Sequence, residues 1–241
     1  MNAYQVDLPQ SGPAWHDWRR EGIGGSEIPT VLGISPYPDA TVKRLVRQKL
    51  GLEQPTEFLN WAARRGQLLE PKARKMLADR YAVGIWVACV EHRLNRHHRA
   101  SLDGYWSYGP DDETHICEIK ALNHELHLLF GEVADGERPV HDLPAHLLVQ
   151  CQWQLYVSGA DCCHFCCYSE KRGEGRQLHV VKLYPEPVLW GVYLIPAVQR
   201  FWDRLAIMRR VGYGVGGVGE DVFERDFREL FPEEAKCEVP V

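Results

Sequence analysis

The pattern of apolar and polar residues along the chain predicts helices around a group of strands. Apolar side chains recur at helical spacing over residues 39–50, 57–81, 144–157 and 186–211. Asp39 is the expected N-cap of the first of these helices, and Gly51 is its stop. Gly66 is the weak point of the second helix, and Pro144 opens the third.

Stretches rich in β-branched and aromatic residues predict strands between the helices. They cover residues 85–93, 99–106, 115–121, 162–169 and 177–184. Gly109–Pro110 and Asp111–Asp112 supply a turn between the second and third strands, and residues 131–143 are expected to form a polar loop. The sequence therefore predicts an α/β fold, a small mixed sheet flanked by helices, in one domain over residues 1–211.

The amino-acid composition distinguishes a C-terminal tail from this domain. The chain has 241 residues, of which 45% are hydrophobic and 25% charged, enough for a core without disulfides. Five glycines in residues 212–219 predict a flexible connector to an acidic C-terminus, so residues 212–241 are placed outside the domain. We see no signal peptide and no apolar run of membrane-spanning length, so we expect a cytoplasmic protein with reduced cysteines and no membrane contact.

The net charge of −5 belongs entirely to the tail, because residues 220–241 hold eight acids and three bases. The remainder is neutral, yet its basic residues bunch at Arg19–Arg20, Lys43–Lys49, Arg64–Arg65, Lys72–Lys75 and Arg93–Arg99. Such bunching is typical of a groove that faces phosphates, and equally of ordinary solvated helix faces. Both interpretations stay open.

The segment from Ser101 to Lys120 carries the candidate chemistry. Side chains alternate between the faces of a strand, so Glu118 and Lys120 point the same way while Ile119 points into the core. If Asp103 reaches the same pocket, its carboxylate, that of Glu118 and the carbonyl oxygen of Ile119 are hard ligands suited to Mg²⁺. The metal would polarise a phosphate and activate water, and Lys120 would orient that water or stabilise negative charge. The pattern predicts phosphodiester hydrolysis; the alternative is an ion pair on a surface strand.

Further short motifs surround these residues in a fixed order. They are Trp15-x-x-x-Arg19, Gly24–Gly25–Ser26–Glu27, Gly66-x-x-x-Glu70–Pro71, Asp103–Gly104, Glu118–Ile119–Lys120 and Gln150-x-Gln152. This set, within residues 15–158, resembles the lambda exonuclease and YqaJ-like viral recombinase family of the PD-(D/E)xK nuclease superfamily. Leu102 departs from the family, in which proline commonly precedes the aspartate, and this affects the turn rather than the ligands.

The resemblance implies a restriction-endonuclease-like core whose catalytic centre contains Asp103, Glu118 and Lys120. It places Glu70 near the metal as a helix-borne acid, bound directly or through water. It implies Mg²⁺ as cofactor, with Mn²⁺ as a substitute, and a 5′-to-3′ exonuclease that digests double-stranded DNA from its ends and leaves 3′ single strands for phage-type recombination. A homotrimeric ring and a partner protein that anneals single-stranded DNA are also implied.

One glutamine on the helix over residues 144–157, Gln150, is expected to join this centre. Gln150 and Gln154 are four residues apart and share a helix face, whereas Gln152 points elsewhere. The family motif favours Gln150, whose amide would hydrogen-bond the attacking water, Lys120 or a phosphate. The alternative is a solvated helix glutamine.

A second candidate site would bind the 5′-phosphate of a DNA end. The fork of Arg19 can hold two phosphate oxygens, Gly24–Gly25 expose backbone N–H groups, and Ser26 adds a hydroxyl. In the alternative interpretation, Ser26 only caps a helix that begins near Glu27, and Arg19 pairs with an acid such as Glu21.

The run Cys162–Cys163–His164–Phe165–Cys166–Cys167 permits a zinc or iron–sulfur site. Because adjacent cysteines on a strand face opposite ways, we expect a buried strand that holds no metal and no iron–sulfur cluster. Two alternatives to the exonuclease are kept: an iron–sulfur nuclease of the RecB-like or CRISPR-associated kind, and a non-catalytic module that grips DNA ends.

Overall fold

A single mixed sheet forms the centre of the protein, for which a computed structural model describes residues 3–54, 61–108, 112–170, 176–213 and 219–232. Its strands are β1 (Ala3–Val6), β2 (Trp86–His92), β3 (Arg99–Tyr108), β4 (Glu113–Lys120), β5 (Cys162–Tyr168) and β6 (Leu178–Leu183). They lie in the order β1-β2-β3-β4-β5-β6; β4 and β5 are parallel, and the other neighbours are antiparallel. The predicted small mixed sheet is confirmed.

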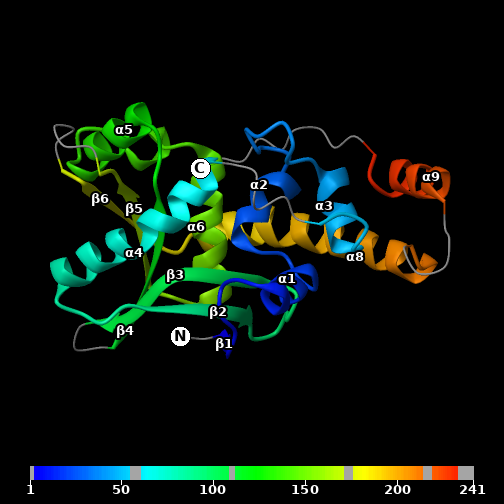
Figure 1. Cartoon of the computed structure of the whole chain (residues 1–241), viewed down its shortest axis with the longest axis horizontal. Helices are drawn as coiled ribbons and strands as arrows, with labels where there is room; N and C mark the ends of the chain where they lie inside the picture. Colours follow the sequence, from blue (N-terminus) through cyan, green and yellow to red (C-terminus); the bar gives the residue numbers. More distant parts are fainter. Residues whose placement is uncertain (1–2, 55–60, 109–111, 171–175, 214–218, 233–241) are drawn as a thin grey trace.

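Helices cover both faces of the sheet (Figure 1). They are α1 (Pro13–Arg20), α2 (Ile28–Val31), α3 (Val42–Lys49), α4 (Trp61–Tyr81), α5 (His124–Ala134), α6 (Ala145–Ser158), α7 (Pro187–Leu189), α8 (Ile195–Val211) and α9 (Glu220–Leu230). Two 3-10 turns, η1 (Gly25–Glu27) and η2 (Val140–Asp142), and a π-helical turn, η3 (Trp190–Leu194), complete the structure. Helix α4 packs against β3 to β6, whereas α6 packs against β2, β3 and β5 and also contacts α2 and η1.

Side-chain alternation on β5 divides the interior into two cores. Cys163, Phe165 and Cys167 belong to the larger core, which includes residues of α5, α6 and α8. Cys166 and Tyr168 belong to a smaller core with residues of α4. All seven side chains of β5 are buried, as expected for a strand paired on both edges and covered on both faces. The predicted alternation of the cysteine run is therefore present.

One predicted helix boundary needs correction, and another lies outside the described residues. Helix α3 begins after Thr41, whose hydroxyl accepts the backbone N–H of Arg44 at 3.2 Å, so Thr41 rather than Asp39 is the N-cap. The stop at Gly51 is confirmed, since its φ of 75° favours glycine. Helix α4 is described from Trp61, and the predicted start of this helix at residue 57 lies outside the described residues.

The helix predicted over residues 186–211 is present as one unbroken helical run from Pro187 to Val211, but it is not α-helical throughout. Its segments are α7, the π-helical turn η3 and α8, and Pro196 sits in the first turn of α8. Proline has no backbone N–H and its ring clashes with the preceding turn, which explains why an α-helical ladder does not continue through this point.

The loop expected over residues 131–143 is also partly wrong. Helix α5 extends to Ala134, and Asn123 caps its start by accepting the N–H of Leu126 at 3.0 Å. Strand β1 and helix α9 were not expected at all. Phe223 of α9 is 1% exposed and lies in the larger core, so this part of the acidic segment packs against the rest of the fold.

Some expectations fall on residues that are not described. They are most of the turn at Gly109–Asp112 and residues 214–218 of the glycine-rich connector. Among the described helices, none is both long and apolar enough to cross a membrane.

Candidate active site

Strand β4 brings a carboxylate and an ammonium into one pocket. The Glu118 side chain is nearly fully buried, and its Oε1 lies 2.7 Å from Nζ of Lys120. Burial acts to lower the pKa of Lys120, but the Glu118 carboxylate outweighs it, so the pKa is raised and the lysine is held as a cation. The two side chains thus share a face, as the period of a strand requires.

Asp103 reaches this pocket from the neighbouring strand β3. Its Oδ2 accepts the backbone N–H of Ile119 at 2.8 Å, which places the carboxylate beside the Glu118–Lys120 segment. Burial, the Glu118 carboxylate and Glu70 together raise the pKa of Asp103 well above its ordinary value. The acids are therefore close enough to repel one another in a poorly solvated site.

Glu70 approaches from helix α4 on the same pocket. It pairs with Arg74 one turn later, and the Arg74 Nε donates to the carbonyl oxygen of Asp103 at 2.5 Å. Burial, opposed by Arg74 and reinforced by Glu118, raises the pKa of Glu70. Arg74 thus ties α4 to β3 at the site, a contact that the sequence analysis did not identify.

Helix α6 supplies two glutamines to Glu118, not one. The Nε2 of Gln150 donates to Oε1 at 2.6 Å, and the Nε2 of Gln154 donates to Oε2 at 2.6 Å. Gln152 points away and hydrogen-bonds the backbone of Tyr184 and the indole of Trp190. Gln154 was missed as a site residue, although its spacing of four from Gln150 was the signal that could have found it.

The donor chemistry of this cluster fits a hard divalent cation. Three carboxylates (Glu70, Asp103 and Glu118) face two cations (Lys120 and Arg74), and burial together with mutual repulsion raises the pKa of Glu70 and Asp103. A divalent cation would relieve that repulsion, and carboxylate and carbonyl oxygens are the ligands that Mg²⁺ prefers. Asp103, Glu118, the Ile119 carbonyl and Glu70 are the residues that would hold it.

Arg19 and Ser26 meet at a separate hollow of about 1010 Å³. The Nη2 of Arg19 lies 3.0 Å from Oγ of Ser26, and the guanidinium stacks 4.8 Å from the ring centre of Trp15. Ser26 is exposed, and Arg20 and Arg44 also line the hollow. An arginine fork, a hydroxyl and further cations around one opening are suited to a phosphate.

The alternative interpretation of these two residues is met in part, because Arg19 does pair with a nearby acid but Ser26 does not cap a helix. Ser26 lies within the short turn η1, and the Glu27 side chain, not the serine, accepts the N–H of Gly24 at 2.8 Å. Arg19 pairs with Glu27 at 3.4 Å, whereas Glu21 pairs with Arg209 at 2.8 Å. Ser26 is therefore not the helix cap that this interpretation required.

Lys49 is a further residue that the sequence did not single out. It is 3% exposed, and its Nζ lies 2.8 Å from both carboxylate oxygens of Glu27. Burial lowers the pKa of Lys49 to about 8 against the opposing effect of Glu27. Lys49 therefore offsets part of the charge of Glu27, which also pairs with Arg19 at the edge of the hollow.

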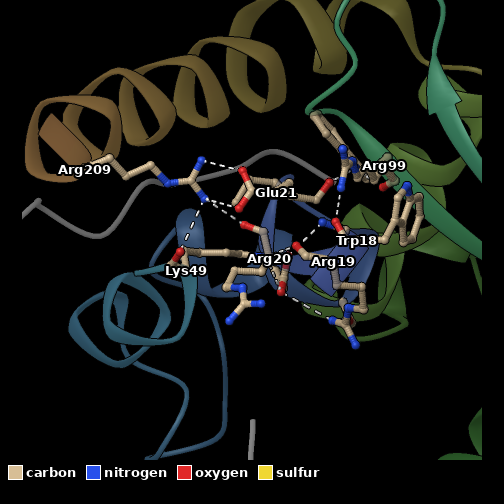
Figure 2. Close-up of polar contacts among 12 residues, drawn as sticks. Trp18, Arg19, Arg20, Glu21, Lys49, Arg99 and Arg209 are labelled. Carbon is tan, nitrogen blue, oxygen red and sulfur yellow. Dashed lines mark hydrogen bonds and ion pairs between the residues drawn. The ribbon is translucent and has the colours of Figure 1, made fainter. Parts of the chain in front are cut away.

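Three cations fix the C-terminal turn of α1, which carries Arg19 (Figure 2). The carbonyls of Trp18, Arg19 and Arg20 accept hydrogen bonds from Arg99, Lys49 and Arg209 respectively. These carbonyls lie at the negative end of the helix, where cations are favoured. Arg19 is thus positioned by contacts from β3, α3 and α8.

Both candidate sites adjoin the short turn η1. A Cβ added to Gly25 would lie 3.3 Å from the side chains of both Gln150 and Gln154, so η1 packs directly on the glutamines that hold Glu118. Asp103, Glu118 and Lys120 do not themselves line the hollow around Arg19. The structure therefore groups the predicted residues in two sites linked through α6.

Comparison with solved structures defines the class of fold. The alkaline exonuclease LHK-Exo from Laribacter hongkongensis matches with a TM-score of 0.63 and 21% identity, over 84% of this chain and 99% of that one. LHK-Exo in complex with dAMP gives 0.65 and 22%, over 82% and 94%. A phage-related exonuclease from Haemophilus somnus 129PT gives 0.55 and 16%, over 78% and 96%. The sheet and its flanking helices thus share the fold of these exonucleases.

The family follows from the sequence itself. The YqaJ-like viral recombinase domain matches residues 14–161, and the chain belongs to that family. The predicted resemblance is confirmed. No curated protein matches the chain in sequence.

Proposed function

We propose that this protein is a Mg²⁺-dependent exonuclease that digests double-stranded DNA from its ends in the 5′-to-3′ direction. One observation carries the proposal: Asp103 and Glu118 lie together in a buried pocket with Lys120 paired to Glu118. Carboxylates crowded in this way gain from a divalent cation, and an adjacent lysine is suited to a reaction in which negative charge develops on a phosphate.

Each residue of the two candidate sites would have its own role in the reaction. Bound Mg²⁺ would polarise the scissile phosphate and lower the pKa of a coordinated water. Lys120 would orient that water or stabilise the charge that develops on the phosphate oxygens. Gln150 would hold Glu118 in place and remain close enough to contact the water or the phosphate. Arg19 and Ser26 would hold the 5′-phosphate of the end being digested.

The solved relatives support an exonuclease activity. LHK-Exo is described as an alkaline exonuclease and has been solved with dAMP, a nucleotide of the kind that an exonuclease releases. The viral recombinase family supports a role in generating 3′ single strands for phage-type recombination. A ring-shaped homotrimer and a single-strand annealing partner are proposed from the family resemblance alone. Light scattering on the purified protein tests the trimer, and a monomer at assay concentration would contradict it.

Digestion of labelled duplexes tests the activity. Linear duplexes labelled separately at each 5′ and 3′ end are incubated with and without Mg²⁺, beside a circular duplex. We expect Mg²⁺-dependent loss of the 5′ label first and an intact circle. Binding to ends without release of nucleotides would favour the non-catalytic module, and cleavage of the circle would refute the requirement for an end.

A further inference from the structure

The smaller core contains a second group of side chains with metal-binding chemistry. His115 is in β4, and Cys162 and His164 are in β5; all three are buried. One ligand atom from each lies within 4.8 Å of the others. Neither histidine nor the thiol takes part in the proposed nuclease centre.

The sheet itself creates this group. In the parallel pair of β4 and β5, His115 stands in register with Cys162, and His164 follows two residues later on the same face. Glu118 is three residues beyond His115, so it projects to the opposite face, about 10 Å farther along the strand. The two groups are therefore separated by the thickness of the sheet and by distance along it.

We infer that His115, Cys162 and His164 form a zinc site on the face of the sheet covered by α4. Two imidazoles and one thiolate are a donor set typical of zinc, with a fourth position for solvent. A cavity of about 260 Å³, lined by all three residues, gives access to that position. This site is independent of the proposed nuclease activity.

The distances agree with a tetrahedral ion. Nδ1 of His115 and Nε2 of His164 are 2.9 Å apart. Two Zn–N bonds of about 2.0–2.1 Å at a tetrahedral angle place the nitrogens roughly 3.3 Å apart. A shift of a few tenths of an ångström would thus replace the hydrogen bond between the rings by two metal bonds.

Neighbouring groups hold the rings in orientations suited to a ligand. Trp106 stacks on His115 with centroids 5.6 Å apart, and Tyr81 meets His164 edge-on at 4.9 Å. Nε2 of His115 lies 3.4 Å from the Glu113 carboxylate, so the nitrogen turned away from His164 faces an acid. Proteins commonly fix a metal-bound histidine by a hydrogen bond from its far nitrogen to a carboxylate, and Glu113 would have to move closer to accept one.

His164 and Cys162 are in protonation states that allow a metal ion to replace the thiol proton of Cys162. Burial and the neighbouring His115 lower the pKa of His164 to about 3, so its ring is neutral and can offer a lone pair. Burial raises the pKa of Cys162 to about 11, so the free thiol keeps its proton. Formation of the Zn–S bond would release that proton to solvent.

The structure also changes how the cysteine run is understood. A site built from neighbouring cysteines is unfavourable because Cys162 and Cys163 face opposite ways. The partners of Cys162 come instead from another residue of its own strand and from β4, which sequence spacing alone does not bring together. We therefore revise the expectation of a metal-free strand at this one cysteine.

Cobalt spectroscopy tests the site directly. Co²⁺ is titrated into protein without a polyhistidine tag, in excess Mg²⁺ that occupies the carboxylate centre. We expect one equivalent to produce a thiolate-to-cobalt charge-transfer band and the ligand-field bands of a tetrahedral ion, and one equivalent of Zn²⁺ to abolish both. Carboxylate ligands cannot give the thiolate band. Its absence from the wild-type protein would overturn the proposal.

Two matched variants locate the ligand. Cys162→Ala should lose the thiolate band and bind Zn²⁺ at least about 100-fold more weakly in chelator competition. Cys163→Ala, which removes the adjacent buried thiol on the opposite face, should bind as the wild type does. Circular dichroism checks that both variants fold. Equal Zn²⁺ affinity of Cys162→Ala and wild type would also refute the site, whereas a rise in Tm with Zn²⁺ only where Cys162 is present would support it.

Discussion

Gln154 offers a sharp test of the candidate active site, because its role was not expected from the family motif. Gln154→Leu keeps the bulk that packs against Gly25 but removes the 2.6 Å hydrogen bond to the buried Glu118 carboxylate. A hydrogen bond to a buried charge contributes about 1.5–3 kcal/mol. If the reacting arrangement of Glu118 depends on that contact, the same energy corresponds to a rate lower by roughly 10- to 100-fold.

The assay compares this variant with Gln152→Leu. Gln152 is equally buried on the same helix, at 2% exposed, but it bonds Tyr184 and Trp190 instead of Glu118. Denaturant unfolding and nuclease rate at saturating Mg²⁺ are measured for both. We expect both variants to lose stability but only Gln154→Leu to lose rate. Equal rates, or equal losses of rate, would show that Gln154 acts through the fold and not through Glu118.

Three further predictions concern the remaining site residues. Lys120→Ala and Glu118→Gln should each abolish cleavage, while the circular dichroism spectrum and the DNA affinity stay close to those of the wild type. The control is Lys75→Ala, which breaks an exposed ion pair on α4. Normal turnover by either site variant would refute the assignment of these residues to the active site. Arg19→Lys keeps the charge but loses the planar fork, so it should slow the digestion of 5′-phosphorylated duplex and leave the digestion rate of 5′-hydroxyl duplex little changed. An equal loss of rate on both duplexes would contradict the end-binding role. The raised pKa of Asp103 means that folding takes up protons, so without metal the Tm should fall as pH rises from the ordinary carboxyl range through that raised pKa. In thermal melts, Mg²⁺ should restore the Tm at the upper end of this pH window, and Asp103→Asn should weaken both the pH effect and the metal effect. A metal effect that does not depend on pH would argue against the proposed ligands.

The elements around the catalytic motif could be predicted because local signals agreed there. Strand period places Glu118 and Lys120 on one face, and the antiparallel ladder of β3 and β4 brings Asp103 beside Ile119. Strand pairing of this kind depends on a short turn between adjacent segments, which a sequence displays. Strands β2 to β6 and helices α3, α4, α6 and α8 were likewise predicted from local patterns, whereas β1, α1, α5 and α9 were not.

Other features depend on contacts between distant segments, which a single sequence does not display. In the sequence, Lys49 is one more basic residue on an amphipathic helix. Only the structure shows that α1 packs beside it and that it is the buried ion-pair partner of Glu27. Helix α9 reads as an acidic tail, and only the placement of Phe223 in the larger core identifies it as part of the fold. Pairing between β4 and β5 likewise requires a connection of some 40 residues before His115 meets Cys162.

The contact between α9 and α3 bears on how the protein would respond to salt. Glu224 pairs with Lys43, and Glu220 lies 2.6 Å from Arg47, whose guanidinium also stacks over Phe223. A base already paired with a carboxylate releases few counterions when it meets a phosphate, so it adds little to the salt dependence of DNA affinity. The slope of log affinity against log salt should therefore be shallower than the number of basic residues on α3 suggests. A protein that binds in this way would hold the DNA backbone weakly and rely on the end of the duplex to select its substrate.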